Sequence, residues 1–289
     1  MIADRVAVLD WSAAGRPVVG SNAIWLGIAG PDGVSAQNLP TRHQAEARLR
    51  ALVTETLAAG ERLLLGADFA FGYPPGFARA LTGTSAALAV WHWLEQHIED
   101  HPDNSHNLRH VAAAINARFA GGGPFWGNGA RAEVPGLPRR RPPLPPGLTA
   151  HRPADIAARS SGGTPKSVWQ LAGAGAVGAQ SLTGLPVLER LRRAFPKTLA
   201  VWPFQPADTP VVVAEVYPSM LSAEVRAAEA AEGAGACRDR VQVTLLASAL
   251  LRLSQAGTLG EMLHDRRAGE DGQILGAGHV ATLRAALAD

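Results

Sequence analysis

The sequence predicts an α/β protein in which a mixed sheet is flanked by helices and interrupted by a large, mostly helical insertion. Three observations support this fold class. Short apolar runs typical of buried strands lie toward both ends of the chain, at 5–10, 62–69, 199–204 and 211–218. Apolar residues at helical spacing occupy 42–59, between the first strands and the next one. The segment 74–196 does not continue this alternation of strand and helix.

The first elements are expected to be three strands joined by short turns. The runs are RVAVLD (5–10), NAIWLGIA (22–29) and VSAQNL (34–39), and a Pro-Asp-Gly turn precedes the third. Strands joined by short connections pair antiparallel, so this part predicts a meander. The helix expected over 42–59 has Gly60 as its stop signal. The run RLLLGADF (62–69) is almost wholly apolar, which is typical of a strand covered on both faces.

The segment 74–196 is interpreted as an insertion into a core made of 1–73 and 197–289. Helical spacing predicts helices over 86–98 and 107–119, and a broken helix over 168–195. The intervening segment 121–165 is rich in glycine and proline and is expected to form a long loop. Two strands and further helices, including 238–253 and 278–288, complete the chain.

Composition limits the class of protein. The 289 residues are 47% hydrophobic, which is ample for a sizeable core. The formal net charge is only +2, so the overall balance carries no signature of nucleic-acid binding. No run approaches the roughly 18 apolar residues of a membrane span, and the first strand is too short for a secretory signal. A cytoplasmic protein without membrane segments is therefore expected. The single cysteine, Cys237, excludes an internal disulfide framework and a cysteine-cluster metal site.

Three of the predicted strands each carry an acid toward their carboxyl end. Asp10, Asp68 and Glu215 follow apolar runs, and ligands of open α/β sheets bind beyond the carboxyl ends of the strands. Carboxylates that converge there need a neutralising cation or a raised pKa, and oxygen ligands favour Mg²⁺ or Mn²⁺. We therefore expect Asp10 and Asp68 to face one another across adjacent parallel strands. Taken singly, each acid is also typical of a turn or a helix cap.

A fourth acid, Asp239, lies in the first turn of the predicted helix 238–253. A helix that begins beneath the sheet edge would direct this carboxylate toward the other three, as a further metal ligand. Complementing the positive end of the helix dipole is an equally good explanation for an acid at this position.

The order of these elements resembles the ribonuclease H-like fold. GADFAFGYP (66–74), EVYPSML (215–221) and the late acidic helix resemble a family of predicted nucleases with that fold, catalogued as a domain of unknown function. The resemblance covers about residues 1–75 and 200–255. It implies a mixed five-stranded sheet and metal-dependent phosphoryl transfer, with matching positions at Asp10, Asp68, Glu215 and Asp239. Some proteins similar along the full length carry a label of molybdopterin guanine dinucleotide synthesis.

Two unusual segments supply candidate substrate contacts. GPFWGNG (123–129) and QLAGAGAVGAQ (170–180) offer an aromatic face and amide groups suited to a nucleobase or another planar ligand. Close helix packing through small residues is the alternative for the second segment. Ser12 is a candidate phosphate contact or loop cap. The three consecutive arginines at 139–141 are also candidate phosphate contacts. The candidate substrate-binding residues are Ser12, Trp126, Asn128, Gln170, Gln180, Arg139, Arg140 and Arg141.

The leading functional hypothesis is metal-dependent hydrolysis of a phosphodiester, with Asp10, Asp68 and Glu215 as catalytic residues. Two Mg²⁺ or Mn²⁺ ions ~3.5 to 4 Å apart would be bridged by Asp10, with Asp68 and Glu215 as outer ligands. The expected partner is nucleic acid or a nucleotide-like small molecule. Three alternatives remain: a nucleotide-dependent enzyme of actin-like or sugar-kinase type with DWSAAGRP (10–17) as phosphate loop, a protein of molybdopterin guanine dinucleotide synthesis, and a non-catalytic binding module.

Overall fold

The structure, a computed structural model of the chain, describes residues 2–160, 163–264, 266 and 269–288. Its centre is a mixed six-stranded sheet with the strand order β3-β2-β1-β4-β6-β5. The α/β class is therefore confirmed. The strands are β1 (Arg5–Asp10), β2 (Ile24–Gly30), β3 (Gly33–Leu39), β4 (Leu63–Ala67), β5 (Leu199–Trp202) and β6 (Val211–Glu215).

The strand pairing follows the expected pattern with one addition. β1, β2 and β3 form the antiparallel meander that the short turns predict. β4 is parallel to β1, and β6 is parallel to β4. The expectation of five strands is wrong, because β5 pairs in parallel with β6 as a sixth strand at the edge. All four residues of β5 are buried, which explains why this short run is so apolar.

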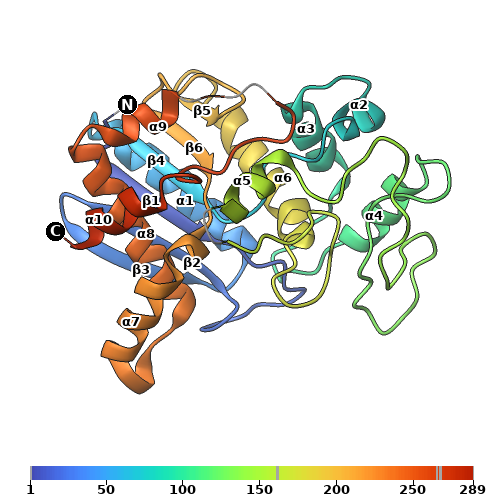
Figure 1. Cartoon of the computed structure of the whole chain (residues 1–289), viewed down its shortest axis with the longest axis horizontal. Coiled ribbons are helices and arrows are strands. Elements are labelled where there is room, and N and C mark those ends of the chain that lie inside the picture. Colours follow the sequence, from blue (N-terminus) through green and yellow to red (C-terminus); the bar gives the residue numbers. More distant parts are fainter. Residues whose placement is uncertain (1, 161–162, 265, 267–268, 289) are drawn as a thin grey trace.

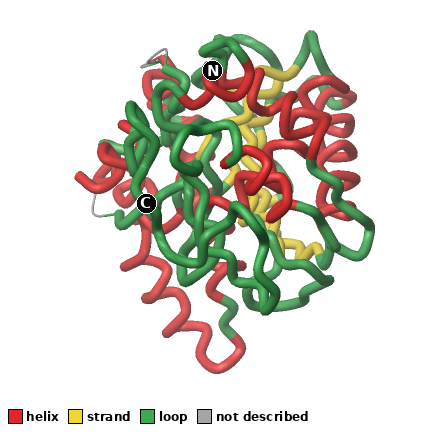
Figure 2. The backbone as a smooth tube through the Cα atoms, turned by 90° about the vertical axis from the view of Figure 1, so that its right-hand side faces the viewer, coloured by secondary structure: helices red, strands yellow, loops and turns green. Residues whose placement is uncertain are grey.

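Helices cover both faces of the sheet (Figures 1 and 2). Alternate residues of β1 point to opposite faces, as the pleat requires. Ala7 and Leu9 share a hydrophobic cluster with α1 and α6, whereas Val6 and Val8 share one with α8, α9 and α10. β4 and β6 lie between these layers and are buried along their whole length. The helices named here are α1 (Arg42–Ala58), α6 (Gly178–Ala194), α8 (Arg238–Gln255), α9 (Thr258–His264) and α10 (Val280–Ala288).

The predicted insertion is helical only in parts. The two helices expected over 86–98 and 107–119 are present, slightly shortened. The long loop expected over 121–165 is wrong in part: 121–150 is irregular, but a helix forms over Pro153–Ser160. The broken helix expected over 168–195 begins only at Gly178, because Gly173 and Gly175 adopt left-handed backbone angles that interrupt a helix. The remaining elements are α2 (Phe77–Thr82), α3 (Ala87–His97), α4 (Leu108–Asn116), α5 (Pro153–Ser160), α7 (Ser222–Glu232) and the 3₁₀ turns η1 (Pro218–Leu221) and η2 (Gly233–Gly235).

The sheet and the segment 74–196 share one hydrophobic core. The aromatic rings of Phe69 and Phe71, which follow β4, pack in series with Trp11 and with Trp91 of α3. In Figure 1 the helices α2, α3 and α4 and the adjoining loops gather at one side of the sheet. The segment therefore completes the core beyond the strand ends, and its division from 1–73 and 197–289 as a domain remains a prediction.

No helix in the described part of the chain combines the length and the apolarity that a membrane crossing requires.

The packing of α8 on the sheet depends on a glycine in β2. A Cβ atom on Gly27 would lie 2.7 Å from the carbonyl carbon of Val243, so the helix backbone has to sit directly on this position. We expect Gly27→Ala to lower the free energy of unfolding by about 1–3 kcal/mol, because the added methyl displaces α8. Chemical denaturation measures the change. Gly235→Ala, where an added Cβ meets open space, is the matched control. Equal stability of the two variants would contradict this account of the packing.

Candidate functional site

Two acids lie side by side at the ends of the neighbouring central strands β1 and β4. Leu9 of β1 is in register with Ala67 of β4, and the next residues are Asp10 and Asp68. The backbone N–H of Asp68 donates to the carbonyl oxygen of Leu9 at 2.9 Å, so the parallel pairing continues to this point. Adjacent strands lie roughly 4.8 Å apart, close enough for two short carboxylates to converge. The expected placement of Asp10 and Asp68 on adjacent parallel strands is confirmed. We call these two residues the acid pair.

The acid pair lies in an environment that opposes negative charge. Burial, followed by the charges of Asp68 and Asp239, raises the pKa of Asp10 well above its usual value. Burial, followed by Glu215 and Asp239, raises the pKa of Asp68 to about 7. Within the described residues, neither carboxylate of the acid pair has an ion-pair partner. A bound proton or a bound cation therefore stabilises this site.

Glu215 is placed near the acid pair but is already neutralised. It is buried at the end of β6, where Arg152 donates to its two carboxylate oxygens at 2.6 and 2.7 Å. The backbone N–H of Phe71 donates to one of the same oxygens at 2.8 Å. The oxygens of Glu215 are thus already occupied by a guanidinium and an amide, and its expected role as an outer metal ligand stays a prediction. Asp155 forms the second ion pair of Arg152, at 2.7 Å.

Arg152 is the functional neighbour that sequence reasoning missed. Asp155 accepts a hydrogen bond from the backbone N–H of Arg152 at the start of α5, so the Arg-x-x-Asp spacing signals a local cap. The pairing with Glu215 joins residues 63 positions apart, and no local pattern indicates it.

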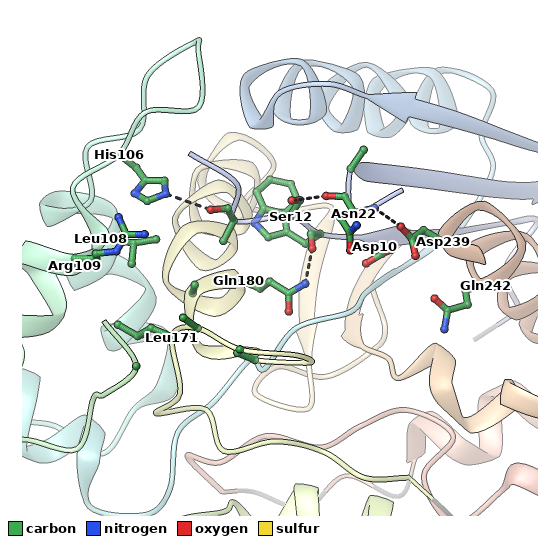
Figure 3. A pocket seen from close by; sticks show the side chains of 18 residues that line it. Asp10, Ser12, Asn22, His106, Leu108, Arg109, Leu171, Gln180, Asp239 and Gln242 are labelled. Atoms are coloured by element: carbon green, nitrogen blue, oxygen red, sulfur yellow. Dashed lines mark hydrogen bonds between the residues drawn. The ribbon is translucent and has the colours of Figure 1, made fainter. Parts of the chain in front are cut away.

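Asp239 lies in the first turn of α8 and lines the same pocket as Asp10. Its carboxylate accepts a hydrogen bond from the backbone N–H of Asn22 at 2.7 Å. Figure 3 shows Asp239 beside Asn22 and Asp10. The predicted inward direction of this side chain is confirmed, although one of its oxygens serves the loop before β2.

The donor set fits one divalent ion better than a preformed pair of ions. In the ranges that the structure describes, no group of three or more His, Cys, Asp or Glu side chains is placed to hold a metal. The acid pair itself fits Mg²⁺ or Mn²⁺, because its two carboxylates lack a neutralising partner and Mg²⁺ commonly binds through one or two carboxylates with water and substrate phosphate. Glu215 does not fit as a ligand while Arg152 holds it.

A polar pocket of about 420 Å³ opens beside Asp10, and we call it the Asp10 pocket. Figure 3 shows its acids, Asp10 and Asp239, at one end and His106 with Arg109 at the other. Gln180 lies between the two ends and donates from Nε2 to the carbonyl oxygen of Trp11 at 2.5 Å. The predicted contact residue Gln180 is thus brought to the acid pair.

A second pocket, of about 310 Å³, opens beside Asp68, and we call it the Asp68 pocket. Arg152, Glu215 and Lys166 line it, and Gln180 lines both this pocket and the Asp10 pocket. The acid pair therefore lies where two hollows meet, with the Gln180 side chain at their boundary.

The loop after β1 is held by a buried arginine. The Arg42 guanidinium donates to the carbonyl oxygens of Ser12 and Ala14, at 3.2 and 2.8 Å, and to both oxygens of Asp100. The Ser12 hydroxyl donates to the carbonyl oxygen of Asn22 at 2.8 Å. Ser12 thus lines the Asp10 pocket but already uses its proton in the loop. The helical spacing of 42–59 gave no sign that Arg42 is buried and fixes this loop.

The remaining predicted contacts fall into two groups. Trp126, Gln170 and Arg141 line a third pocket, of about 640 Å³. Asn128 is buried and ties its own loop, since its side chain accepts from the N–H of Ala130 and donates to the carbonyl oxygen of Ala132. Two further arginines do not line any of these three pockets. Arg139 donates to backbone carbonyl oxygens of the same loop, and Arg140 is exposed.

Comparisons with protein-family models, with curated proteins and with solved structures found no match for this chain. The functional argument therefore depends on the acid pair and the pockets around it.

The Arg152–Glu215 pair is expected to support folding. Glu215→Gln should lower the free energy of unfolding by about 3 kcal/mol, because it removes the charge that neutralises a buried guanidinium. Chemical denaturation measures this, and Glu261→Gln on the exposed side of α9 is the control with the same chemical change. A loss below ~0.5 kcal/mol would show that the pair contributes little.

In the metal-free protein, the acid pair is expected to lower the free energy of unfolding when it is ionised. Burial raises the pKa of Asp68 to about 7 in the folded state. As the pH rises, the unfolded chain therefore loses the Asp68 proton at a lower pH than the folded protein does. Stability should therefore fall between about pH 4 and pH 7, and Asp68→Asn should remove that part of the fall, on the order of 2 kcal/mol after allowing for screening by pocket solvent. Denaturation in a chelator across this pH range measures the difference. A difference between the two proteins that does not change with pH would contradict it.

Proposed function

We propose that this chain is a divalent-metal-dependent phosphodiester hydrolase with a ribonuclease H-like core. The observation that carries the proposal is the acid pair, two carboxylates on adjacent parallel strands that lack a neutralising partner among the described residues and face a polar pocket. Such a pair is costly to the fold in the absence of a ligand, and a divalent cation is the ligand that suits it.

The strand arrangement supports the ribonuclease H-like assignment. An antiparallel meander is followed by a helix and by a strand parallel to the first, and β6 then adds beside β4. This is the order of elements on which the resemblance in the sequence rests. The additional edge strand β5 lies away from the acid pair and leaves the arrangement of β1, β4 and β6 intact.

The residues divide the work of such a reaction. Asp10 and Asp68 would hold the cation, and Asp239, which lines the same pocket as Asp10, would add negative charge near it. A divalent ion supplies a water of lowered pKa and neutralises charge on the phosphate. Because Arg152 holds Glu215, the carboxylates that remain would suit one ion rather than two.

The end of the Asp10 pocket opposite the acids is suited to a backbone phosphate of the substrate. Burial, followed by the charge of Arg42, lowers the pKa of His106, so this imidazole is neutral at pH 7. Its Nε2 contacts the carbonyl oxygen of Ala13 at 3.2 Å. The positive charge at this end therefore comes from Arg109, which lines the pocket opposite the acids (Figure 3).

Mg²⁺ or Mn²⁺ should raise the melting temperature of the wild-type protein and permit cleavage of oligonucleotides. A ligand at 100 times its Kd adds about 2.7 kcal/mol of stability when it binds only the folded state. Asp10→Asn should abolish both effects, whereas Asp208→Asn, on an exposed turn, should preserve them. Differential scanning fluorimetry and gel assays with single- and double-stranded DNA and RNA give the readouts. Metal-dependent cleavage by Asp10→Asn at the wild-type rate would refute the proposal.

The alternatives carried from the sequence are separated by the same measurements. Stabilisation by ATP or GTP with Mg²⁺, without oligonucleotide cleavage, would favour the nucleotide-dependent enzyme or molybdopterin guanine dinucleotide synthesis. No response to metal, nucleotide or oligonucleotide would favour the binding module.

A further inference from the structure

The third pocket is lined by basic and aromatic residues, and we call it the basic pocket. Its volume is about 640 Å³. Among the residues that the structure describes, no acidic side chain lines it, in contrast to the Asp10 and Asp68 pockets. The residues that give it this character are Trp126, Arg141, His151, Arg159, Lys166 and Gln170.

The cations of the basic pocket are available to an external anion. Across the described ranges, Arg141, Arg159 and Lys166 have no carboxylate partner, whereas Arg42, Arg152 and Arg190 are ion-paired. Arg159 contacts Nε2 of His151 at 2.7 Å. Burial and then the charge of Arg159 lower the pKa of His151, so its neutral ring accepts this bond. A phosphate group that entered this pocket would find three cations without a carboxylate partner among its lining residues.

Trp126 provides an unused aromatic surface in the same pocket. Its backbone is fixed by hydrogen bonds with Trp169 and Leu171, at 3.0 and 2.9 Å. Its ring is partly exposed and, among the residues that can be described, it has neither an aromatic neighbour nor an acceptor for its N–H. Trp169, by contrast, is fully buried against Phe77 and Phe125. Trp126 packs against the hydrophobic core and remains partly exposed, and an indole fixed in this way is suited to stacking on a planar ring.

The basic pocket is joined to the acid pair. Thr164, Pro165 and Lys166 line both the basic pocket and the Asp68 pocket. The Asp68 pocket in turn shares Gln180 with the Asp10 pocket. A ligand that lies along these walls would therefore place one end at the carboxylates and another against Trp126 and the arginines.

We propose that the basic pocket binds a neighbouring nucleotide of a single-stranded nucleic acid whose scissile phosphate lies at the acid pair. This deepens the proposed function and rests on it. A base within a duplex is stacked and paired, so only an unpaired base can stack on Trp126. A mononucleotide can occupy either the acid pair or the basic pocket but not both. The cations and the aromatic face of the basic pocket therefore favour a strand that reaches from one to the other.

The test measures binding separately from cleavage. Labelled single-stranded oligonucleotides of about eight nucleotides are titrated against the Asp10→Asn protein in a chelator, with fluorescence anisotropy, at about 50 and about 200 mM salt. Arg141→Ala and Lys166→Gln should each weaken binding and reduce the salt slope by about one. Trp126→Ala should weaken it on the order of tenfold, with partial recovery in Trp126→Phe. Arg131→Ala, an exposed charge on the adjoining loop, is the control and should change affinity less than about twofold.

The outcomes separate this proposal from the hydrolase proposal. Selective weakening in the pocket variants supports the nucleic-acid site even if the wild-type protein cleaves nothing, which would then refute only the hydrolase. Metal-dependent cleavage with an unchanged KM in Arg141→Ala, Lys166→Gln and Trp126→Ala would refute the basic pocket alone. Mononucleotide binding as tight as that of the oligonucleotide, or equal binding of duplex, would also overturn the single-strand assignment. Circular dichroism confirms that each variant is folded.

Discussion

The ion pair between Arg152 and Glu215 is the contact on which the geometry of the site depends. It joins the start of α5 to the end of β6, a strand that is buried along its whole length. A carboxylate buried at that point requires a fixed positive charge, and Arg152 supplies it from a segment remote in sequence. The same contact holds the wall of the Asp68 pocket against the sheet. The acid pair, at the ends of β4 beside it and of β1 beyond β4, has no such compensation among the described residues, so the two kinds of buried acid differ in electrostatic environment.

The sequence predicted the centre of the fold well because local physical signals determine it. The apolar runs of β1, β4 and β6 are too hydrophobic for exposed strands, and the short turns of the meander leave antiparallel pairing as the simple solution. Acids at the ends of these runs were found by the same reasoning. Asp10 and Asp68 meet because parallel neighbours in register end at the same edge of the sheet. The sixth strand was counted among the apolar runs but is absent from the five-stranded pattern that the family resemblance implies.

The parts that sequence reasoning did not identify are contacts between distant segments. Nothing near Arg152 or Arg42 indicates which carboxylate each will neutralise, because the partners lie 63 and 58 positions away. The same limit explains why Glu215 was assigned to a metal. Asn128 was chosen for its amide group, but that amide satisfies the backbone of its own loop. Arg141 and Trp126 were both selected, whereas their neighbours Arg159 and Lys166 in the basic pocket were not, since the loop that brings them together has no regular spacing.

The hydrogen bond from Asn22 to Asp239 closes the Asp10 pocket with residues 217 positions apart in the chain. The residues of one wall are therefore synthesised early, and Asp239 of the other wall only with α8. Closing so long a loop carries an entropic cost that the finished core must offset. A nascent or truncated chain that stops before α8 would present Asp10 and Asp68 without the facing wall. Formation of the complete pocket thus depends on nearly the whole chain, because a fragment that ends before α8 lacks Asp239 and Gln242.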